Sequence, residues 1–440
     1  MKIEIFQSSH GDCLLLESSD GKRMLCDGGM PGAMTEYVGP ELAARRAAGQ
    51  GDRIDLVYVS HIDADHIGGV LKLLEDLVSW RAHDFHRDQG DEGFAEPDRP
   101  RPPEVAAIWH NAFHDQVDEN VGRIEDMMAA TAPVLLATQA PAGLRAGFEM
   151  EQIALGVDQA LRVSRLIGAN LLDIPINRLP AEDGPAKLLM ARPDQDPIRL
   201  GTFEIRIIGP TESELSKLRE GWNNWLERSQ ERLEKIDREM QRRMAEFSAS
   251  ADPEAIPARE WEGVEGFRNV TVPNLASLVL FVREGERTLL LTGDAQHDIL
   301  EEQLKEAGLL DDGHLHLDVL KVQHHGSENN MSPGFARIVS ADHYLFCGDG
   351  QSGNPEPEVV DQIFHSRMSG DAAVRALAPE AADDRQFHFW FSTSVETPAH
   401  TSEARANFRA LTEHVQELRA QSHGRLELHF NTGPALNVVL

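Results

Sequence analysis

The chain has 440 residues, of which 41% are hydrophobic, and its formal net charge is −31. This composition allows a full globular core, and the acidic excess excludes a broad surface that coats nucleic acid, since such a surface needs Lys and Arg against the phosphates. The chain has no apolar run of about eighteen residues or more, so we expect no transmembrane helix. With only three cysteines we expect no disulfide framework, and a reducing cytoplasm fits this usage.

The first predicted elements are antiparallel strands within residues 1–27, because KIEIFQ, CLLLES and RMLCDGG lie around an Asp-Gly turn. DLVYVS (55–60) predicts a short buried strand, and HIGGVLKLLEDLVSWRAHDF, which follows the next loop, predicts a helix from its apolar spacing. Several apolar strands run directly into His or Asp, which places polar side chains at strand ends, as α/β layers usually do. Such further strands are predicted at 104–111, 203–210, 277–294, 317–327, 341–350 and 426–440.

Three stretches interrupt this pattern within what we expect to be one domain over residues 1–440. Residues 84–103 are charged and proline-rich and predict a loop. Residues 120–200 predict a helical and loop-rich insertion. Residues 212–260 predict a helical arm, whose part from 212 to 247 carries a near-heptad apolar stripe. The arm either lies on the body of the protein or projects as a lid or a contact between copies of the chain.

The densest group of polar side chains is in VSHIDADHIGG (59–69), between the strand at 55–60 and its helix. On such a loop His61, Asp63 and Asp65 can face one pocket from different sides, and His66, at the start of the helix, can turn back to it. Asp65 alone is also a candidate helix cap. Capping does not explain the other three side chains, so we predict that the four hold two neighbouring cations.

More candidate ligands follow other strands. Asp294 follows LLLTG and can bridge two cations with its two oxygens. In VQHHGS, His325 is the better ligand candidate because it precedes a glycine, and His324 is a candidate proton donor. Asp27, at the end of the third strand, can accept from a ligand histidine and fix its tautomer.

The ligand types indicate both the metal and the reaction. Asp63, Asp65 and Asp294 make the set rich in hard oxygen, so Mn²⁺ is as plausible as Zn²⁺. Two such ions about 3.5–4 Å apart would bridge a hydroxide, lower its pKa and stabilise a leaving oxygen. We predict hydrolysis, with Asp65 orienting the hydroxide.

The motif order CDGG, SHIDADHIGG, TGD and HHGS resembles that of the metallo-β-lactamase superfamily of hydrolases. QSSHGDCLLLE, NLASLVLFV and LKVQHHGS make the chain similar to the ComEC-type competence hydrolase domain and its standalone relatives. The resemblance implies an αββα sandwich with metals at one sheet edge. It implies the ligands His61, Asp63, Asp65, His66, Asp294 and His325, with Asp27 as the first-motif aspartate. His110 and His114 are the two candidates for the third-motif ligand.

These observations together predict a dinuclear Zn²⁺ or Mn²⁺ hydrolase that cleaves phosphodiesters in nucleic acid or nucleotides, with Lys321 or His324 as possible phosphate contacts. One alternative is hydrolysis of an ester, thioester or lactam on the same metals. Another is a partner-binding or regulatory protein that works through the 212–247 arm, with structural metals. The hydrolase domain of ComEC itself is attached to a membrane channel, whereas this sequence predicts no membrane segment, so the resemblance does not imply DNA uptake.

Overall fold

The computed structural model describes the two sheets of the protein and the helices around them. The predicted arm at 212–260 and the insertion at 120–200 lie largely outside the described residues. The described ranges are 1–91, 93–111, 159, 162–179, 188–192, 195–215, 277–382, 385–397 and 401–440.

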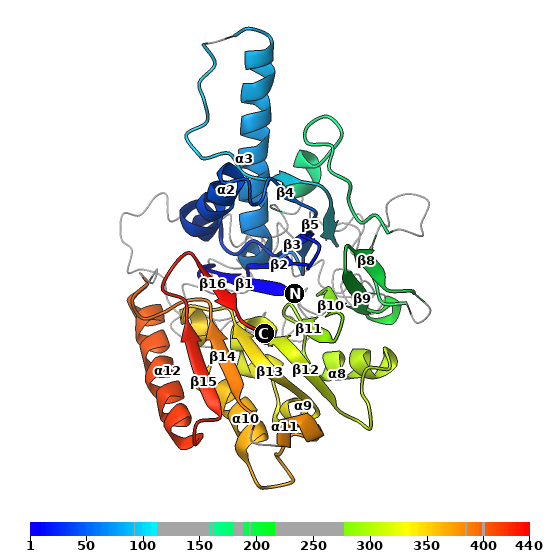
Figure 1. The fold of residues 1–440 in the computed structure, drawn as a ribbon, viewed down its shortest axis with the longest axis vertical. Helices are drawn as coiled ribbons and strands as arrows, with labels where there is room; N and C mark the ends of the chain where they lie inside the picture. The colour runs from blue at the N-terminus through cyan, green and yellow to red at the C-terminus, as the bar shows by residue number, and fades with distance from the viewer. Residues whose placement is uncertain are drawn as a thin grey trace, which may run out of the picture.

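The first sheet is formed mostly by the N-terminal part of the chain (Figure 1). Its first three strands pair antiparallel and the C-terminal strand adds to their edge, whereas β3, β5 and β7 run parallel. In spatial order the strands are β16 (Ala435–Val438), β1 (Lys2–Phe6), β2 (Leu14–Glu17), β3 (Arg23–Cys26), β5 (Leu56–Val59) and β7 (Ile108–His110).

The second sheet contains eight described strands, mostly from the C-terminal half of the chain. Strands β11 to β15 are parallel, and β8 to β11 are antiparallel. In spatial order they are β15 (Leu426–Phe430), β14 (Phe387–Phe391), β13 (Val339–Phe346), β12 (Leu315–Lys321), β11 (Arg287–Leu291), β10 (Val279–Glu284), β9 (Phe203–Gly209) and β8 (Ile198–Leu200). Two short strands, β4 (Arg53–Ile54) and β6 (Glu104–Val105), pair separately.

The two sheets pack face to face, because one buried apolar cluster contains side chains from both, including Leu16, Tyr58, Leu280 and Val319. A second cluster joins the first sheet to its helices, and a third joins the other sheet to its helices. The predicted αββα sandwich is therefore confirmed (Figure 1). The helices are α1 (Pro31–Ala33), η1 (Met34–Val38), α2 (Gly39–Ala47) and α3 (Ala64–Asp88) on the first sheet, and α8 (His297–Glu306), α9 (Pro333–Ile338), α10 (Pro357–Met368), α11 (Pro379–Ala382) and α12 (Ser402–Gln421) on the second.

The predicted strands are present, and the structure differs from the expectations elsewhere. The loop predicted at 84–103 begins too early, because α3 continues to Asp88. The rest of that segment folds back on the helix, where Trp80 donates to the carbonyl of Arg99 at 3.0 Å and Arg101 pairs with Asp84. The strands β14 (FHFWF) and β8 were not predicted, and β8 lies in the stretch predicted as a helical and loop-rich insertion. Among the described helices none is long and apolar enough to cross a membrane.

Both sheets bring the carboxyl ends of parallel strands to one end of the sandwich. From the first sheet these ends lead to Asp27, His61 and His110, and from the second to Asp294 and His325. The sheets are tied together here, since the amide of Leu278 donates to the carbonyl of Ser60 at 2.7 Å and the Tyr58 hydroxyl donates to the carbonyl of Leu278. Residues distant in the chain therefore meet at this edge.

Candidate metal centre

The loops at this edge have unusual backbone conformations. Asp27, His324 and His325 have φ values of 58°, 45° and 56°, a left-handed region that disfavours residues other than glycine. Such strain persists only where the surroundings hold it, and it is common at functional sites. The backbone is therefore strained at these three residues, and this strain fixes the direction of their side chains.

At the start of α3, too, a side chain faces the cluster and does not stabilise the local backbone. Asp63 occupies the N-cap position, but its side chain makes no capping hydrogen bond. Its carboxylate turns instead toward the loop interior, where Oδ2 lies 3.5 Å from Nε2 of His61. Asp65 is not the helix cap that the sequence allowed, because it lies inside the first turn of the helix.

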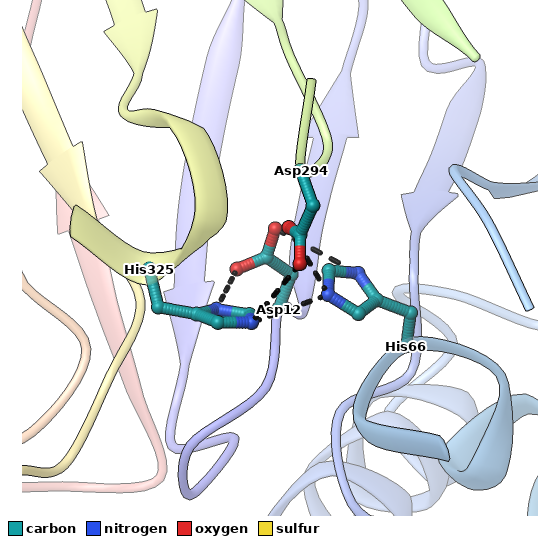
Figure 2. A group of neighbouring side chains, drawn as sticks. All are labelled: Asp12, His66, Asp294 and His325. Atoms are coloured by element: carbon teal, nitrogen blue, oxygen red, sulfur yellow. Dashed lines mark hydrogen bonds and ion pairs between the residues drawn. The ribbon is translucent and has the colours of Figure 1, made fainter. Parts of the chain in front are cut away.

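Two buried histidines from different sheets face each other at the centre of the cluster (Figure 2). His66 and His325 approach with their Nε2 atoms 3.3 Å apart. Asp65 Oδ2 lies 3.0 Å from Nε2 of His325. Asp294 contacts both rings, because its Oδ1 lies 3.4 Å from Nε2 of His66 and its Oδ2 lies 3.7 Å from Nε2 of His325. Two imidazole nitrogens and two carboxylates thus converge on one point.

The Nδ1 atom of each of these two histidines has its own hydrogen-bond partner. Asp27 Oδ2 lies 3.0 Å from Nδ1 of His66, and Asp27 itself accepts from the amide and hydroxyl of Ser60. Nδ1 of His325 lies 3.0 Å from Asp12 Oδ1 and 2.9 Å from the carbonyl of Cys347. A carboxylate or carbonyl on Nδ1 keeps the proton there and leaves Nε2 free for a metal.

A second set of ligand atoms adjoins the first. Nε2 of His61 lies 3.5 Å from Asp63 Oδ2 and 3.5 Å from Asp294 Oδ2, so the Asp294 carboxylate faces both sets. His61 Nε2, Asp63 Oδ1 and Asp294 Oδ1 are buried and, within the described residues, make no hydrogen bond. Buried polar atoms of this kind need a partner, and their nitrogen and carboxylate types suit metal ions.

Two more of the predicted site residues, His110 and His324, lie at or near this edge. His110 is buried at the end of β7, where it pairs with Val59 two residues before His61, and its amide donates to Asn177 Oδ1 at 2.8 Å. His114 lies outside the described residues. His324 is partly exposed, and its Nε2 lies 3.5 Å from Asp294 Oδ2.

The electrostatics of the metal-free cluster favour cations. Burial alone would lower the pKa of His325, but Asp294 and Asp12 raise it to about 10. Against its burial, His66 likewise has its pKa raised by Asp294 and Asp65. Burial would raise the pKa of Asp294, but His324 and His66 hold it well below its usual range. The metal-free cluster thus takes up protons, which a divalent ion replaces on binding.

Residues 9–127 match the family described as Metallo-beta-lactamase superfamily. This part of the chain is a metallo-β-lactamase superfamily domain. Its match includes Asp12, Asp27 and the loop from His61 to His66, while Asp294 and His325 reach the same cluster from the second sheet. No curated protein matches the chain. With this fold and its buried His/Asp cluster, the protein is a metal-dependent hydrolase of the metallo-β-lactamase fold.

Asp12 was not predicted from the sequence, and Lys321 was predicted in a different role. Asp12 lies within 4.8 Å of His66, Asp294 and His325, counted between their potential ligand atoms. Lys321 was named as a candidate phosphate contact, but it is 2% exposed and pairs with Asp12. The signal for Asp12 is its place in HGDC, directly before an apolar strand, where a buried aspartate needs a partner.

Proposed function

We propose that this hydrolase is a phosphodiesterase that acts on nucleic acid or nucleotides with two Zn²⁺ or Mn²⁺ ions. The ComEC-type motifs quoted above support this subgroup and this substrate class. When bound, such ions supply a nucleophile at neutral pH and stabilise the negative charge of the substrate. The three cysteines are free and buried, which supports a reducing compartment such as the cytoplasm.

The observation that carries the substrate class is a cavity of about 350 Å³ with many hydroxyl, amide and charged side chains in its lining. It shares chain segments with the cluster, because Ser9 lies three residues before Asp12, and Asp349 two residues after Cys347, whose carbonyl contacts His325. Hydroxyl and amide groups from both sheets line it, which suits an oxygen-rich substrate. The lining residues are Gln7, Ser9, Glu36, Tyr37, Asp349, Thr393, Ser394, Val395, Thr397, Arg405 and Phe408.

Arg405 gives this cavity its phosphate contact in the proposal. It is exposed on α12 and is the one Lys or Arg among the described lining residues. A guanidinium binds phosphate oxygens through two parallel hydrogen bonds. Glu36 and Asp349 face the same space, and their carboxylates suit the hydroxyl or amino groups of a nucleotide better than a second phosphate.

His324 is oriented as a proton donor to the leaving oxygen. Asn330 donates from Nδ2 to the carbonyl of Asp294 at 2.9 Å, so its Oδ1 faces Nδ1 of His324 at 2.8 Å and accepts from it. This leaves Nε2 of His324 beside the cluster to carry the transferred proton. Asp65, 15% exposed at its side chain, orients the attacking water.

The test compares bis(p-nitrophenyl) phosphate, single-stranded DNA, RNA and cyclic dinucleotides with ester, thioester and lactam substrates, each with Zn²⁺ or Mn²⁺. We expect phosphodiester cleavage. We also expect Arg405→Ala to raise KM about tenfold or more on nucleotide substrates, from the loss of a charge-assisted pair. The matched control is Arg409→Ala, one turn later on α12 and not a lining residue. Activity confined to esters, thioesters or lactams would refute the proposal.

A further inference from the structure

The short loop between β1 and β2 carries a carboxylate into the centre of the molecule. Asp12 is 3% exposed. Its carbonyl accepts from the amide of Gly29 at 2.7 Å, and Ser8 Oγ donates to the carbonyl of Gly11 at 2.6 Å. A side chain at Gly11 would place its Cβ 1.9 Å from the carbonyl oxygen of Asp65. The loop is therefore packed directly against the segment that holds Asp65.

The carboxylate of Asp12 approaches both histidines from their Nδ1 side. Its Oδ1 lies 3.0 Å from Nδ1 of His325, and its Oδ2 lies 3.8 Å from Nδ1 of His66. The Nε2 atoms point the other way, toward each other and toward Asp65. Because the two nitrogens of an imidazole point in different directions, an ion on Nε2 lies away from the carboxylate that holds Nδ1.

Lys321 occupies the other oxygen of Asp12. This lysine ends β12, is 2% exposed, and forms a close ion pair with Asp12 Oδ2. Its Nζ also donates to the carbonyl of Gly293 at 3.1 Å and lies 3.9 Å from Asp294 Oδ1. Lys321 thus connects Asp12 to the backbone loop that presents Asp294.

The charges of the cluster are consistent with this pairing. Lys321 neutralises the charge of Asp12. Four further carboxylates of the cluster, those of Asp27, Asp63, Asp65 and Asp294, then remain to be neutralised. Two divalent cations carry the matching charge. The lysine therefore allows a carboxylate to orient His325 without adding net negative charge to the buried site, where an uncompensated charge is costly.

We propose that Asp12 and Lys321 form a buried, neutral pair that positions His325 for the metal, and that Asp12 does not bind the metal itself. The proposal rests on the metal-dependent hydrolase function and is independent of the substrate. Lys321 neutralises Asp12 and donates to the carbonyl of Gly293, and it contacts neither metal nor phosphate.

The test measures Zn²⁺ binding by chelator competition and metal content at saturating Zn²⁺ for wild type, Asp12→Asn, and the double variant Asp12→Asn/Lys321→Met. For Asp12→Asn we expect about 10–100-fold weaker Zn²⁺ binding, the usual effect of losing a partner of a ligand histidine. Saturated metal content and the visible spectrum of the Co²⁺-loaded protein should match those of wild type. The double variant should bind Zn²⁺ like Asp12→Asn but unfold at a higher temperature, because it no longer buries a lysine that has lost its nearest carboxylate.

A matched control is the exposed ion pair between Arg287 and Asp318, on β11 and β12, whose atoms lie 2.7 Å apart. The variant Arg287→Met/Asp318→Asn should bind Zn²⁺ like wild type. The proposal is overturned if Asp12→Asn loses a metal equivalent or changes the Co²⁺ spectrum, since Asp12 would then be a ligand. It is also overturned if Asp12→Asn binds Zn²⁺ as tightly as wild type. If the single variant does not fold, the double variant decides by the same criteria.

Failure of this proposal is distinguishable from failure of the proposed function. Wild-type protein that binds Zn²⁺ and cleaves only esters or lactams would refute the phosphodiesterase proposal and leave the role of Asp12 intact. Unchanged Zn²⁺ affinity in Asp12→Asn, with phosphodiester cleavage in wild type, would refute the role of Asp12 and leave the phosphodiesterase proposal intact.

Discussion

Replacing Gly69 by alanine is expected to disrupt the packing that holds the histidine loop. Gly69 lies in α3 against the turn after β3, and its amide donates to the carbonyl of Gly29 at 2.8 Å. A Cβ at this position would lie 1.9 Å from the carbonyl oxygen of Gly28. Ordinary contacts between carbon and oxygen begin at about 3.3 Å, so helix and turn must separate by more than about 1 Å.

The energetic cost combines overpacking with two broken hydrogen bonds. Overpacking against backbone costs about 1–3 kcal/mol. The separation also breaks the hydrogen bond from Gly69 to Gly29 and the one from the Gly28 amide to the carbonyl of His66, each about 1 kcal/mol. Better helix propensity of alanine returns about 1 kcal/mol. We expect Gly69→Ala to lower the free energy of unfolding by about 2–4 kcal/mol.

Urea unfolding of wild type, Gly69→Ala and a matched glycine variant measures this effect. The control is Gly32→Ala in α1, where an added Cβ meets nothing within 4 Å. It should leave stability within about 1 kcal/mol of wild type. Gly69→Ala should also bind Zn²⁺ more weakly, because Asp27 and His66 lie on the displaced segments. Equal stability of the two variants would refute the reasoning.

Three further predictions concern protons and thiols. Burial and the nearby His388 lower the pKa of His343 to about 4, and its Nδ1 accepts from Trp390 at 3.1 Å. Because the pKa of His343 is lower in the folded protein than in the unfolded chain, neutral His343 contributes stability above about pH 6.5, and this contribution is lost as the pH falls toward 4. The variant His343→Gln should therefore show a weaker pH dependence of the free energy of unfolding between these two pH values. Metal must displace protons from His66 and His325, so the apparent Zn²⁺ affinity should rise between about pH 6 and 9, measured by chelator competition. All three cysteines are buried with a raised pKa, mainly from burial, so a disulfide reagent should label no thiol quickly in the native protein and three after denaturation.

Much of the sandwich could be predicted because its strands are short apolar runs that end in polar residues. The αββα arrangement was implied by the resemblance that the motif order carries. The strand β14 was missed because it lies among C-terminal elements that carry no motif. The end of α3 was misplaced because its last turn is highly charged and is stabilised by contacts with the segment that follows.

The candidate site shows which part of the prediction is local. His61, Asp63 and His66 lie within six consecutive residues at the start of α3, so their proximity could be inferred from spacing alone. The role of Lys321 could not, because it depends on how β12 of one sheet faces the loop after β1 of the other. A lysine at the end of a strand usually reaches solvent, and only the inter-sheet packing brings it to Asp12.

The most direct test of the metal centre is anomalous diffraction at the zinc edge from crystals grown with saturating Zn²⁺. The account predicts density in contact with Nε2 of His66, Nε2 of His325 and the carboxylate of Asp294. A well-ordered cluster with no anomalous density among these three side chains would contradict it.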